Sequence, residues 1–380
     1  MKIEQIELVE VVVPARPGSI ESEGMHHPLH MLNQGARAGW SLQFDEMPKW
    51  VLIATCDDGT TGLGETYRGV RAETLEEMAW VIVGRDVGSL RWSALPLAPS
   101  REYDGFESLV YDLAGKLTGL PLHQLLGGSH RDEVLVSAWS SHRTPDDAGA
   151  VARDALDQGV THIKFKCSLD DDVVAWAEAI ADSCGDRMRI ILDPNGRFHE
   201  VRHATEIAKR LERVGNVVCL EDPVPRWDLE GFAELRRRTT IPIALHLAMG
   251  YAELGNRRED AYRALHLRAV DMFNFTASIS DFMRLASMAD LVGVPYWHGS
   301  EVDLGILEAV YVHLAAVAPG CILPSDIFGR RIREHDLLAN PLELVGERVR
   351  LPTGPGLGVE LDHAAVDRFA TRRIMVTADG

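Results

Sequence analysis

A repeated pattern after residue 128 is the feature that most limits the folds open to this chain. Short β-branched runs recur roughly every 25 residues, and amphipathic segments such as DDVVAWAEAIADSC and ATEIAKRLERV separate them. Eight strands that alternate with helices predict a parallel β/α barrel, because an open sheet of this kind normally uses fewer strands. The runs are VLVSAWSS from 134, THIKFKCS from 161, RIILDPNG from 189, VVCLEDPV from 217, IPIALHLA from 241, VDMFNFTA from 270, VPYWHGSE from 294 and CILPSDIF from 321.

The first part of the chain predicts a smaller α+β unit. It opens with two alternating stretches, KIEQIELVEVVV and KWVLIATCDDGTTGLGET, and the second contains a hairpin turn signal at Asp-Asp-Gly, 57–59. A helix-rich stretch follows, and the tail RVRLPTGPGLGVELD adds a strand and turn outside the repeat. We therefore predict a first domain over residues 1–128, a barrel over 129–340 and a segment over 341–380 that returns to the first domain.

Composition excludes several classes of partner. The net charge of −18 argues against a nucleic acid or an anionic membrane surface, since both require a basic face. No stretch approaches the roughly 20 apolar residues of a membrane span, and the N-terminus lacks the pattern of a signal peptide. Five cysteines without a C-x-x-C motif fit reduced thiols. Together these features predict a cytoplasmic protein.

Charged and polar residues occupy the predicted strand ends. In a parallel barrel the active site lies at the carboxyl ends of the strands, and alternate residues point inward. Buried charges need partners, so cations that face carboxylates there indicate an active site. Glu301 and Asp303 follow the seventh strand closely. The predicted inward set is Lys164, Lys166, Asp193, Asn195, Glu221, His246, Asn274, Thr276 and His298.

Several phrases, in this order and spacing, resemble the enolase superfamily in its mandelate racemase and muconate lactonizing enzyme branch. They are CDDGTTGLGE, YDLAGKLTGLPLHQLLGG, KFK, DPNG, EDP and GPGLGVELD. The resemblance implies an α+β capping domain over a (β/α)7β modified TIM barrel. It also implies that the loop at 16–40 and the segment 64–69 close over the substrate. His26 and His27 would then reach the pocket, and the alternative for both is simple surface exposure.

The resemblance implies a mechanism as well. Members of the family remove the proton α to a carboxylate, and a divalent ion stabilises the resulting enediolate. Asp193 and Glu221 match the first two metal ligands, and Lys166 matches the general base. An ammonium beside a second ammonium, here Lys164, has its charged form disfavoured, which suits it to accept a proton. Lys164 also suits a substrate carboxylate oxygen, and Asn195 is either a substrate contact or a turn residue.

His246 departs from the family pattern. Most relatives carry Asp or Glu at the end of strand five, and His246 occupies the matching position. A lone histidine among Leu and Ala is usually a core residue. The alternation of side chains along this strand directs His246 into the barrel, however, and this favours a third metal ligand. Imidazole shifts the preference from Mg²⁺, the most available ion, towards Mn²⁺, Ni²⁺, Fe²⁺ or Zn²⁺. It also leaves two negative ligands instead of three.

The opposite face of the site departs too. The position that holds a second base in muconate-type enzymes is Thr276, which is no base. His298 lies one residue before the place of the racemase histidine and lacks an Asp partner; it is either a general acid or a hydrogen-bond donor. Asp303 roughly matches a carboxylate after strand seven, and it supports either Lys166 or the loop.

We therefore predict one-base chemistry on a small-molecule carboxylate. The expected enzyme is a dehydratase of a hydroxy or sugar acid, or a muconate-type cycloisomerase. A racemase or epimerase is the alternative, with His298 as its second base. A non-catalytic barrel relative is the alternative from another class. The resemblance further implies a homo-oligomer, a dimer or an octamer.

Overall fold

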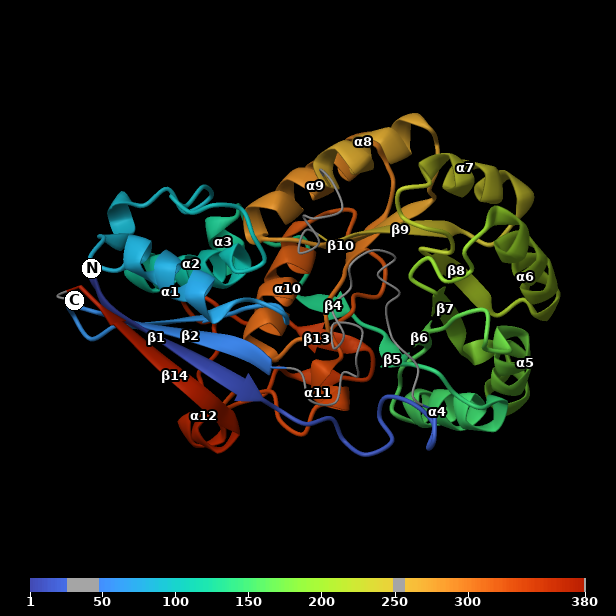
Figure 1. Cartoon of the computed structure of the whole chain (residues 1–380), viewed down its shortest axis with the longest axis horizontal. Coiled ribbons are helices and arrows are strands. Elements are labelled where there is room, and N and C mark those ends of the chain that lie inside the picture. The colour runs from blue at the N-terminus through green and yellow to red at the C-terminus, as the bar shows by residue number, and fades with distance from the viewer. Residues whose placement is uncertain (26–47, 249–256, 379–380) are drawn as a thin grey trace.

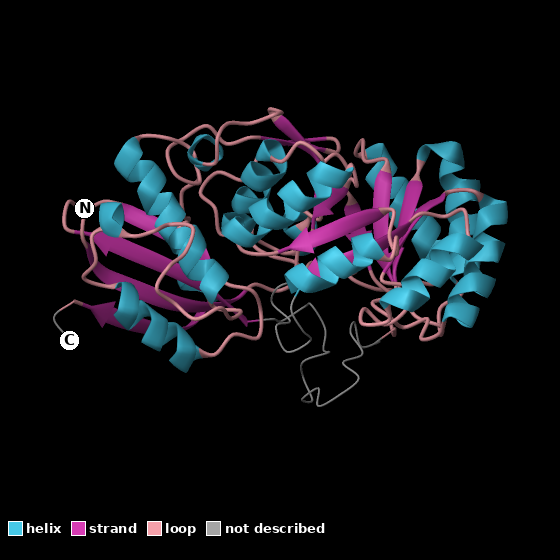
Figure 2. Ribbon diagram, turned by 90° about the horizontal axis from the view of Figure 1, so that it is seen from above, coloured by secondary structure: helices cyan, strands magenta, loops and turns pink. Residues whose placement is uncertain are grey.

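The computed structural model describes residues 1–25, 48–248 and 257–378. An antiparallel sheet and a parallel sheet lie side by side, each with its own helices (Figures 1 and 2). His26 and His27 lie outside the described residues, as does most of the loop predicted at 16–40. Within the described residues, no helix has the length and apolar character needed to cross a membrane.

The antiparallel sheet joins the two ends of the chain. Its strands lie in the order β14-β1-β2-β3, so the last strand pairs with the first (Figure 1). Apolar residues alternate along β1: Ile6 and Leu8 pack in one buried cluster, and Val9 and Val11 pack in another. Both faces of this sheet are therefore covered. Its strands are β1 (Ile3–Val12), β2 (Pro48–Cys56), β3 (Thr61–Glu65) and β14 (Ala370–Thr377), and its neighbouring helices are α1 (Ala72–Ile82), α2 (Tyr103–Thr118), α3 (Leu122–Leu125) and the 3-10 turn Val87–Ser89.

The parallel sheet has seven strands in the order β11-β10-β9-β8-β7-β6-β5, and helices cover its outer side (Figure 1). This arrangement, with the separate antiparallel sheet, confirms the predicted fold class. The strands are β5 (Ala138–Ser140), β6 (His162–Lys166), β7 (Arg189–Asp193), β8 (Val217–Glu221), β9 (Ile243–Ala248), β10 (Met272–Thr276) and β11 (Tyr296–His298). The helices are α4 (Pro145–Asp157), α5 (Val173–Cys184), α6 (Val201–Val214), α7 (Leu229–Arg238), α8 (Arg257–His266), α9 (Ile279–Val292) and α10 (Gly305–Val317), with the 3-10 turn Gly185–Arg187.

The eighth predicted strand differs from the other seven. The run from Cys321 forms only single bridges, from Cys321 to Tyr296 of β11 and from Ser325 to Val136 near β5. Pro324 lies between the two bridged residues and has no N–H to donate to a ladder. The run therefore closes the barrel without forming a continuous strand. The remaining elements are β4 (Glu133–Leu135), β12 (Leu344–Val345), β13 (Arg348–Arg350), α11 (Gly329–Ile332) and α12 (His363–Phe369).

A buried group of charges links the two sheets. Lys49 of β2 donates to Glu65 of β3 at 2.5 Å and to Asp303, which follows β11. Glu65 also accepts from the backbone N–H groups of Leu304 and Leu307 at the start of α10, where carboxylates are favoured. Because Glu65 and Asp303 are fully buried, this group fixes the cap against the mouth of the barrel.

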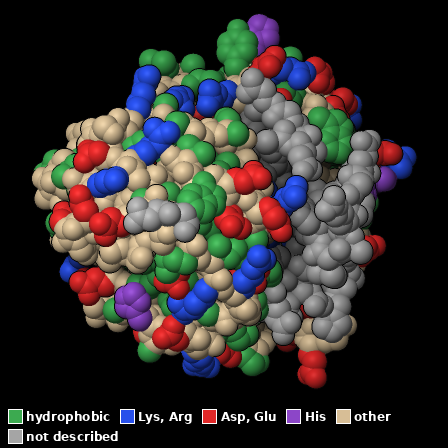
Figure 3. Space-filling view, turned by 60° about the vertical axis from the view of Figure 1, so that its left-hand side comes forward, with side chains coloured by type: hydrophobic (Ala, Val, Ile, Leu, Met, Phe, Trp, Pro, Cys, Tyr) green, Lys and Arg blue, Asp and Glu red, His purple; other side chains and the backbone are tan. Residues whose placement is uncertain are grey.

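One face of the molecule carries side chains of both charges (Figure 3). On the face shown in Figure 3, Asp and Glu side chains are interspersed with Lys and Arg among hydrophobic side chains. Other charged side chains are buried, among them those at the contact between the two sheets and at the ends of the barrel strands.

Candidate active site

The two lysines of β6 lie inside the barrel, beside the end of β7. Parallel pairing sets Lys166 against Asp193, and Lys164 points to the same side two residues earlier. Lys166 Nζ donates to Asp193 Oδ2 at 2.5 Å and to Asn195 Oδ1 at 2.8 Å. Asp193 Oδ1 accepts from the Asn195 backbone N–H at 3.1 Å. Asn195 adopts a φ of 47°, which Asn tolerates better than most residues, and this turn brings its amide back to Lys166.

Lys164 lies among three carboxylates. Its Nζ is 2.7 Å from Glu221 Oε2, 2.8 Å from Asp326 Oδ2 and 3.1 Å from Asp193 Oδ2. Asn274 of β10 donates to Glu221 Oε1 at 2.8 Å and to Asp326 Oδ2 at 3.3 Å. These contacts connect the ends of β6, β7, β8 and β10 with Asp326 of the eighth run.

Asp326 is a site residue that the strand-end reasoning missed. It is the sixth residue of the eighth run, CILPSDIF, so this run carried the same kind of polar residue that identified the other strand ends. Its position depends on the bridge from Ser325 to Val136, which brings the eighth run beside β5. Asp326 is 1% exposed, and its contact with Lys164 places it among the buried charges of the site.

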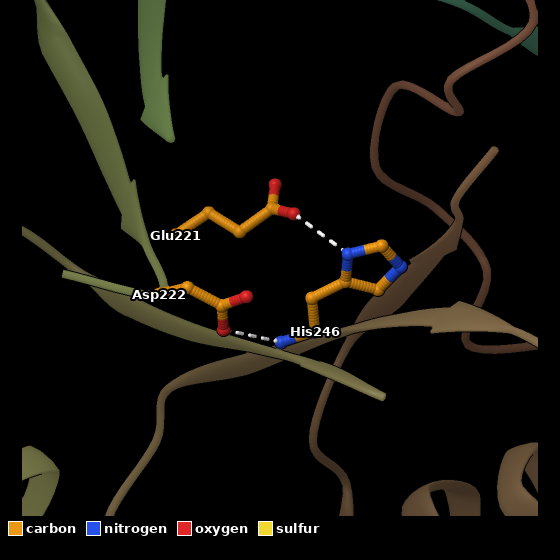
Figure 4. Close-up of side chains that lie close together, drawn as sticks. All are labelled: Glu221, Asp222 and His246. Carbon is orange, nitrogen blue, oxygen red and sulfur yellow. Dashed lines mark hydrogen bonds and ion pairs between the residues drawn. The ribbon is translucent and has the colours of Figure 1, made fainter. Parts of the chain in front are cut away.

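His246 of β9 points towards Glu221 (Figure 4). Its Nδ1 lies 3.4 Å from Glu221 Oε1, and its Nε2 lies 2.8 Å from Thr276 Oγ1. Burial holds the pKa of His246 well below its usual range, and the nearby positive charges of Arg226 and Lys164 act in the same direction. The ring is therefore neutral, which is the form that binds a metal ion.

The residues present fit a divalent cation. Possible ligand atoms of Glu221, Asp222 and His246 lie within 4.8 Å of one another (Figure 4). Asp222 already accepts from the His246 backbone N–H at 2.8 Å and pairs with Arg226. Glu221 Oε2 is fully buried and forms an ion pair with Lys164. Among the described residues it accepts no hydrogen bond. A buried carboxylate oxygen of this kind, beside a neutral imidazole, matches the donor set of a cation site.

The two lysines differ electrostatically. Burial lowers the pKa of Lys166, and Lys164 lowers it further, while Asp193 and Glu221 oppose both effects. Burial also acts to lower the pKa of Lys164, but Asp326, Glu221 and Asp193 outweigh it and raise that pKa well above its usual range. Lys164 is thus a permanent cation, and Lys166 is the lysine that more readily becomes neutral.

The inward position predicted for His298 is wrong. Pairing between β10 and β11 sets Trp297 against the inward-facing Asn274, so His298 points to the helices. Its ring lies between Phe282 and Tyr311, with centroids 4.7 Å and 4.0 Å away, and it is fully buried. Burial lowers the pKa of His298 to about 3. The strand has only three residues. Its sequence pattern was therefore too short to show which of its side chains point into the barrel.

The other predicted residues fall into two groups. Thr276 lies in the site, where it contacts His246. Asp303 lies at the cap contact, where it pairs with Lys49 and accepts from Tyr311 at 2.7 Å and from the Glu301 backbone N–H at 2.8 Å. Of the two roles considered for Asp303, the contacts place it with the loop and the cap.

A small pocket opens at the ends of the strands. Cap and barrel both contribute to it, since Arg68 follows β3 and Glu301 follows β11. Sequence reasoning placed the segment 64–69, which contains Arg68, over the substrate and placed Glu301 just after the seventh strand, but it assigned neither residue a contact and did not single out Arg226. The described lining residues are Arg68, Trp139, Lys164, Lys166, Arg226, His246, Ser300, Glu301, Val302, Asp326 and Phe328.

Comparison with known proteins gives consistent matches. Residues 147–365 match the model of the family described as enolase C-terminal domain-like. The chain is 27% identical to D-galactarolactone cycloisomerase of Agrobacterium fabrum, covering 87% of this chain and 93% of that protein. It is 26% identical to D-gluconate dehydratase of Thermoproteus tenax, covering 82% and 68%. The solved structure of the muconate lactonizing enzyme from Pseudomonas putida superimposes with a TM-score of 0.78 at 21% identity, over 98% of this chain and all of that one.

Proposed function

The chain belongs to the enolase C-terminal domain-like family. On that premise we propose that it removes the proton α to a carboxylate in a hydroxy or sugar acid and releases the β-hydroxyl as water, which takes up that proton. The family membership confirms the resemblance to the mandelate racemase and muconate lactonizing enzyme branch, whose relatives matched by this chain are lyases and isomerases. The chain is accordingly an enzyme of this superfamily. A muconate-type cycloisomerisation is the second proposed reaction, since it uses the same proton transfer.

Lys166 is the proposed general base. The observation that carries the proposal is its position: a buried amine at the end of β6, lowered in pKa and beside the carboxylates that suit a cation. Asn195 holds the Nζ at 2.8 Å and fixes its direction. When a substrate enters, the amine accepts the α proton and Asn195 keeps the resulting ammonium in place. General-base catalysis of this kind contributes about 10²- to 10⁴-fold to rate.

Asp193, Glu221 and His246 are the proposed metal ligands. Asp193 is proposed because it ends β7, the strand beside the one that carries Glu221, and because the family resemblance assigns it this role. Asp222, whose ligand atoms lie near those of Glu221 and His246, is the alternative third carboxylate. A divalent cation held there would supply electrostatic stabilisation of the charge that develops on the substrate carboxylate. Thr276 orients the His246 ring through its Nε2 at 2.8 Å, which leaves Nδ1 on the side of Glu221.

Lys164 is the proposed partner of the substrate carboxylate. It remains charged because three carboxylates raise its pKa, so it offers a fixed positive charge throughout the reaction. Asp326 and Asn274 orient it and Glu221 through the contacts described above. Lys164 thus binds the acid, and Glu221, Asp326 and Asn274 keep Lys164 in position while Lys166 accepts the proton.

Among the residues that the structure describes, the far side of the pocket favours elimination over racemisation. A racemase needs a second base opposite Lys166, and Thr276 has no such function. His298, the candidate for that base, has its ring packed between Phe282 and Tyr311 outside the sheet. We therefore do not assign His298 a role in proton transfer.

A screen in heavy water tests the proposal. Gluconate, glucarate, galactarate and muconolactone would be incubated with the protein and Mg²⁺, Mn²⁺ or Ni²⁺, and NMR would report deuterium at the α carbon or release of a keto acid. The proposal expects both signals to vanish in Lys166→Ala while the bound metal, measured by mass spectrometry, stays unchanged. Persistence of the signals in Lys166→Ala would contradict the role of Lys166. Absence of both signals with every acid would favour a non-catalytic barrel.

A further inference from the structure

Glu301 has one carboxylate oxygen that the fold explains and one that it does not. Oε2 lies 2.5 Å from Arg101 Nη2 and 3.5 Å from Arg68 Nε. Both arginines come from the cap, so this half of the carboxylate joins the cap to the loop after β11. Oε1 is buried and accepts no hydrogen bond from any residue that the structure describes. The side chain is only 3% exposed.

The side chain that carries this oxygen lines the pocket. Glu301 lines it together with Lys164, Lys166 and Asp326. A buried acceptor without a donor loses its hydration and gains nothing in return, so natural proteins rarely retain one without a reason. The occupant of the pocket is the partner that would restore the missing hydrogen bond.

The chemistry of Glu301 defines what this occupant must carry. A carboxylate oxygen accepts hydrogen bonds, and the guanidinium groups of Arg68 and Arg101 both approach the other oxygen, Oε2. The occupant therefore needs a donor at this place. A hydroxyl group supplies one, whereas an unsaturated or saturated diacid without hydroxyls offers only further acceptors, and its second carboxylate would be repelled.

We propose that Glu301 Oε1 accepts a hydrogen bond from a hydroxyl group of the substrate, so that the site selects polyhydroxy acids over acids that lack hydroxyls. This inference rests on the proposed function, because it takes the reacting carboxylate to lie at Lys164 and Lys166. Glu301 is then a specificity residue that touches the substrate away from the reacting carbon. It favours a sugar acid over a muconate-type substrate.

Two acids of equal length test the inference directly. Galactarate and adipate are both six-carbon diacids and differ only in four hydroxyl groups. Calorimetric titration into the metal-loaded Lys166→Ala protein, which cannot turn substrate over, measures binding alone. D-Glucarate provides a second stereochemistry. The same titrations would be made with Glu301→Gln and Glu301→Leu in that background, with Glu230→Gln as a matched control at a carboxylate that is 68% exposed.

At least one hydroxy diacid is expected to bind about 10-fold or more tightly than adipate, because a hydrogen bond to a charged group has that effect. Glu301→Leu is expected to weaken the binding of that hydroxy diacid about 10- to 100-fold and to change the affinity for adipate by less than about 2-fold. Glu230→Gln should change neither. If Glu301→Leu does not fold, as judged by circular dichroism, Glu301→Gln gives the same comparison with a polar group of equal size.

Two results overturn the inference. One is adipate binding as tightly as both hydroxy diacids, and the other is an unchanged preference in a folded Glu301 variant. Exchange of the α proton in heavy water separates this failure from failure of the proposed function. Exchange on muconolactone but on no hydroxy acid refutes the role of Glu301 and keeps that of Lys166, whereas no exchange on any acid refutes both.

Discussion

One buried lysine, Lys49, contributes to the contact between cap and barrel, and its removal should have a large effect on stability. Lys49 lies between Glu65 and Asp303, which are both fully buried. In Lys49→Met the two carboxylates face each other without a cation. Removing one partner from a buried ion pair costs about 3–5 kcal/mol, a large share of the roughly 5–15 kcal/mol that stabilises a typical protein.

The loss should depend on pH with a defined sign. In the natural chain burial alone would raise the pKa of Asp303, but Lys49 outweighs it and holds that pKa below its usual range. Asp303 therefore adds stability that is present above its unfolded pKa and is lost as pH falls. Without Lys49 the pKa of Asp303 rises above the unfolded value, so the stability of the variant should fall as pH rises.

Urea unfolding followed by circular dichroism measures both effects. Lys49→Met is expected to lose about 3–5 kcal/mol at pH 8 and clearly less at pH 5, where one carboxyl can take up a proton. Lys49→Met combined with Asp303→Asn should recover part of the loss. Lys209→Met is the control, because Lys209 is 52% exposed and its pair with Glu212 should contribute less than about 1 kcal/mol. A loss below about 1 kcal/mol at pH 8, or equal losses at both pH values, would refute the reasoning.

Three further predictions concern the barrel. Lys166→Met should reduce α-proton exchange by about 10²- to 10⁴-fold without loss of bound metal, and exchange within about 3-fold of the natural chain would contradict its role. His246→Asp should move the preference among cations towards Mg²⁺, seen as tighter Mg²⁺ and weaker Ni²⁺ binding in titrations; an unchanged order would argue against ligation by His246. His298 has a pKa of about 3 in the folded chain and about 6.5 when unfolded, so its stability contribution is complete above pH 6.5 and is lost as pH falls. When the pH falls from 6.5 to 4, the natural chain should therefore lose about 3 kcal/mol more of its free energy of unfolding than His298→Phe loses. Urea unfolding at both pH values measures this difference, and equal losses in the two proteins would contradict a buried, neutral His298.

The sequence by itself determined the architecture and the residues inside the long strands. Parity along a five-residue strand is a local property, because successive side chains point to opposite faces wherever the strand lies. Lys164 and Lys166 on β6, Asp193 on β7 and Glu221 on β8 could be assigned inward for this reason, and the structure brings them together.

The alternation of side chains did not predict the direction of a residue where the strand is short or where the residue lies beyond the strand. His298 closes a three-residue strand, and its direction follows from the pairing of Trp297 with Asn274 instead of from its own sequence. Asp303 likewise pairs with Lys49, 254 residues away, and not with Lys166. Neither partner can be inferred from local spacing.

Only the tertiary structure decided which loop residues complete the pocket. Glu301 meets Arg68 and Arg101 because the cap rests on the loop after β11, and Asp326 reaches Lys164 because the eighth run closes the barrel. Local sequence fixes periodicity and the faces of regular elements, since these depend on the backbone geometry of neighbouring residues. Contacts between loops depend on how whole elements pack, and that packing is settled by the burial of surface across the entire chain.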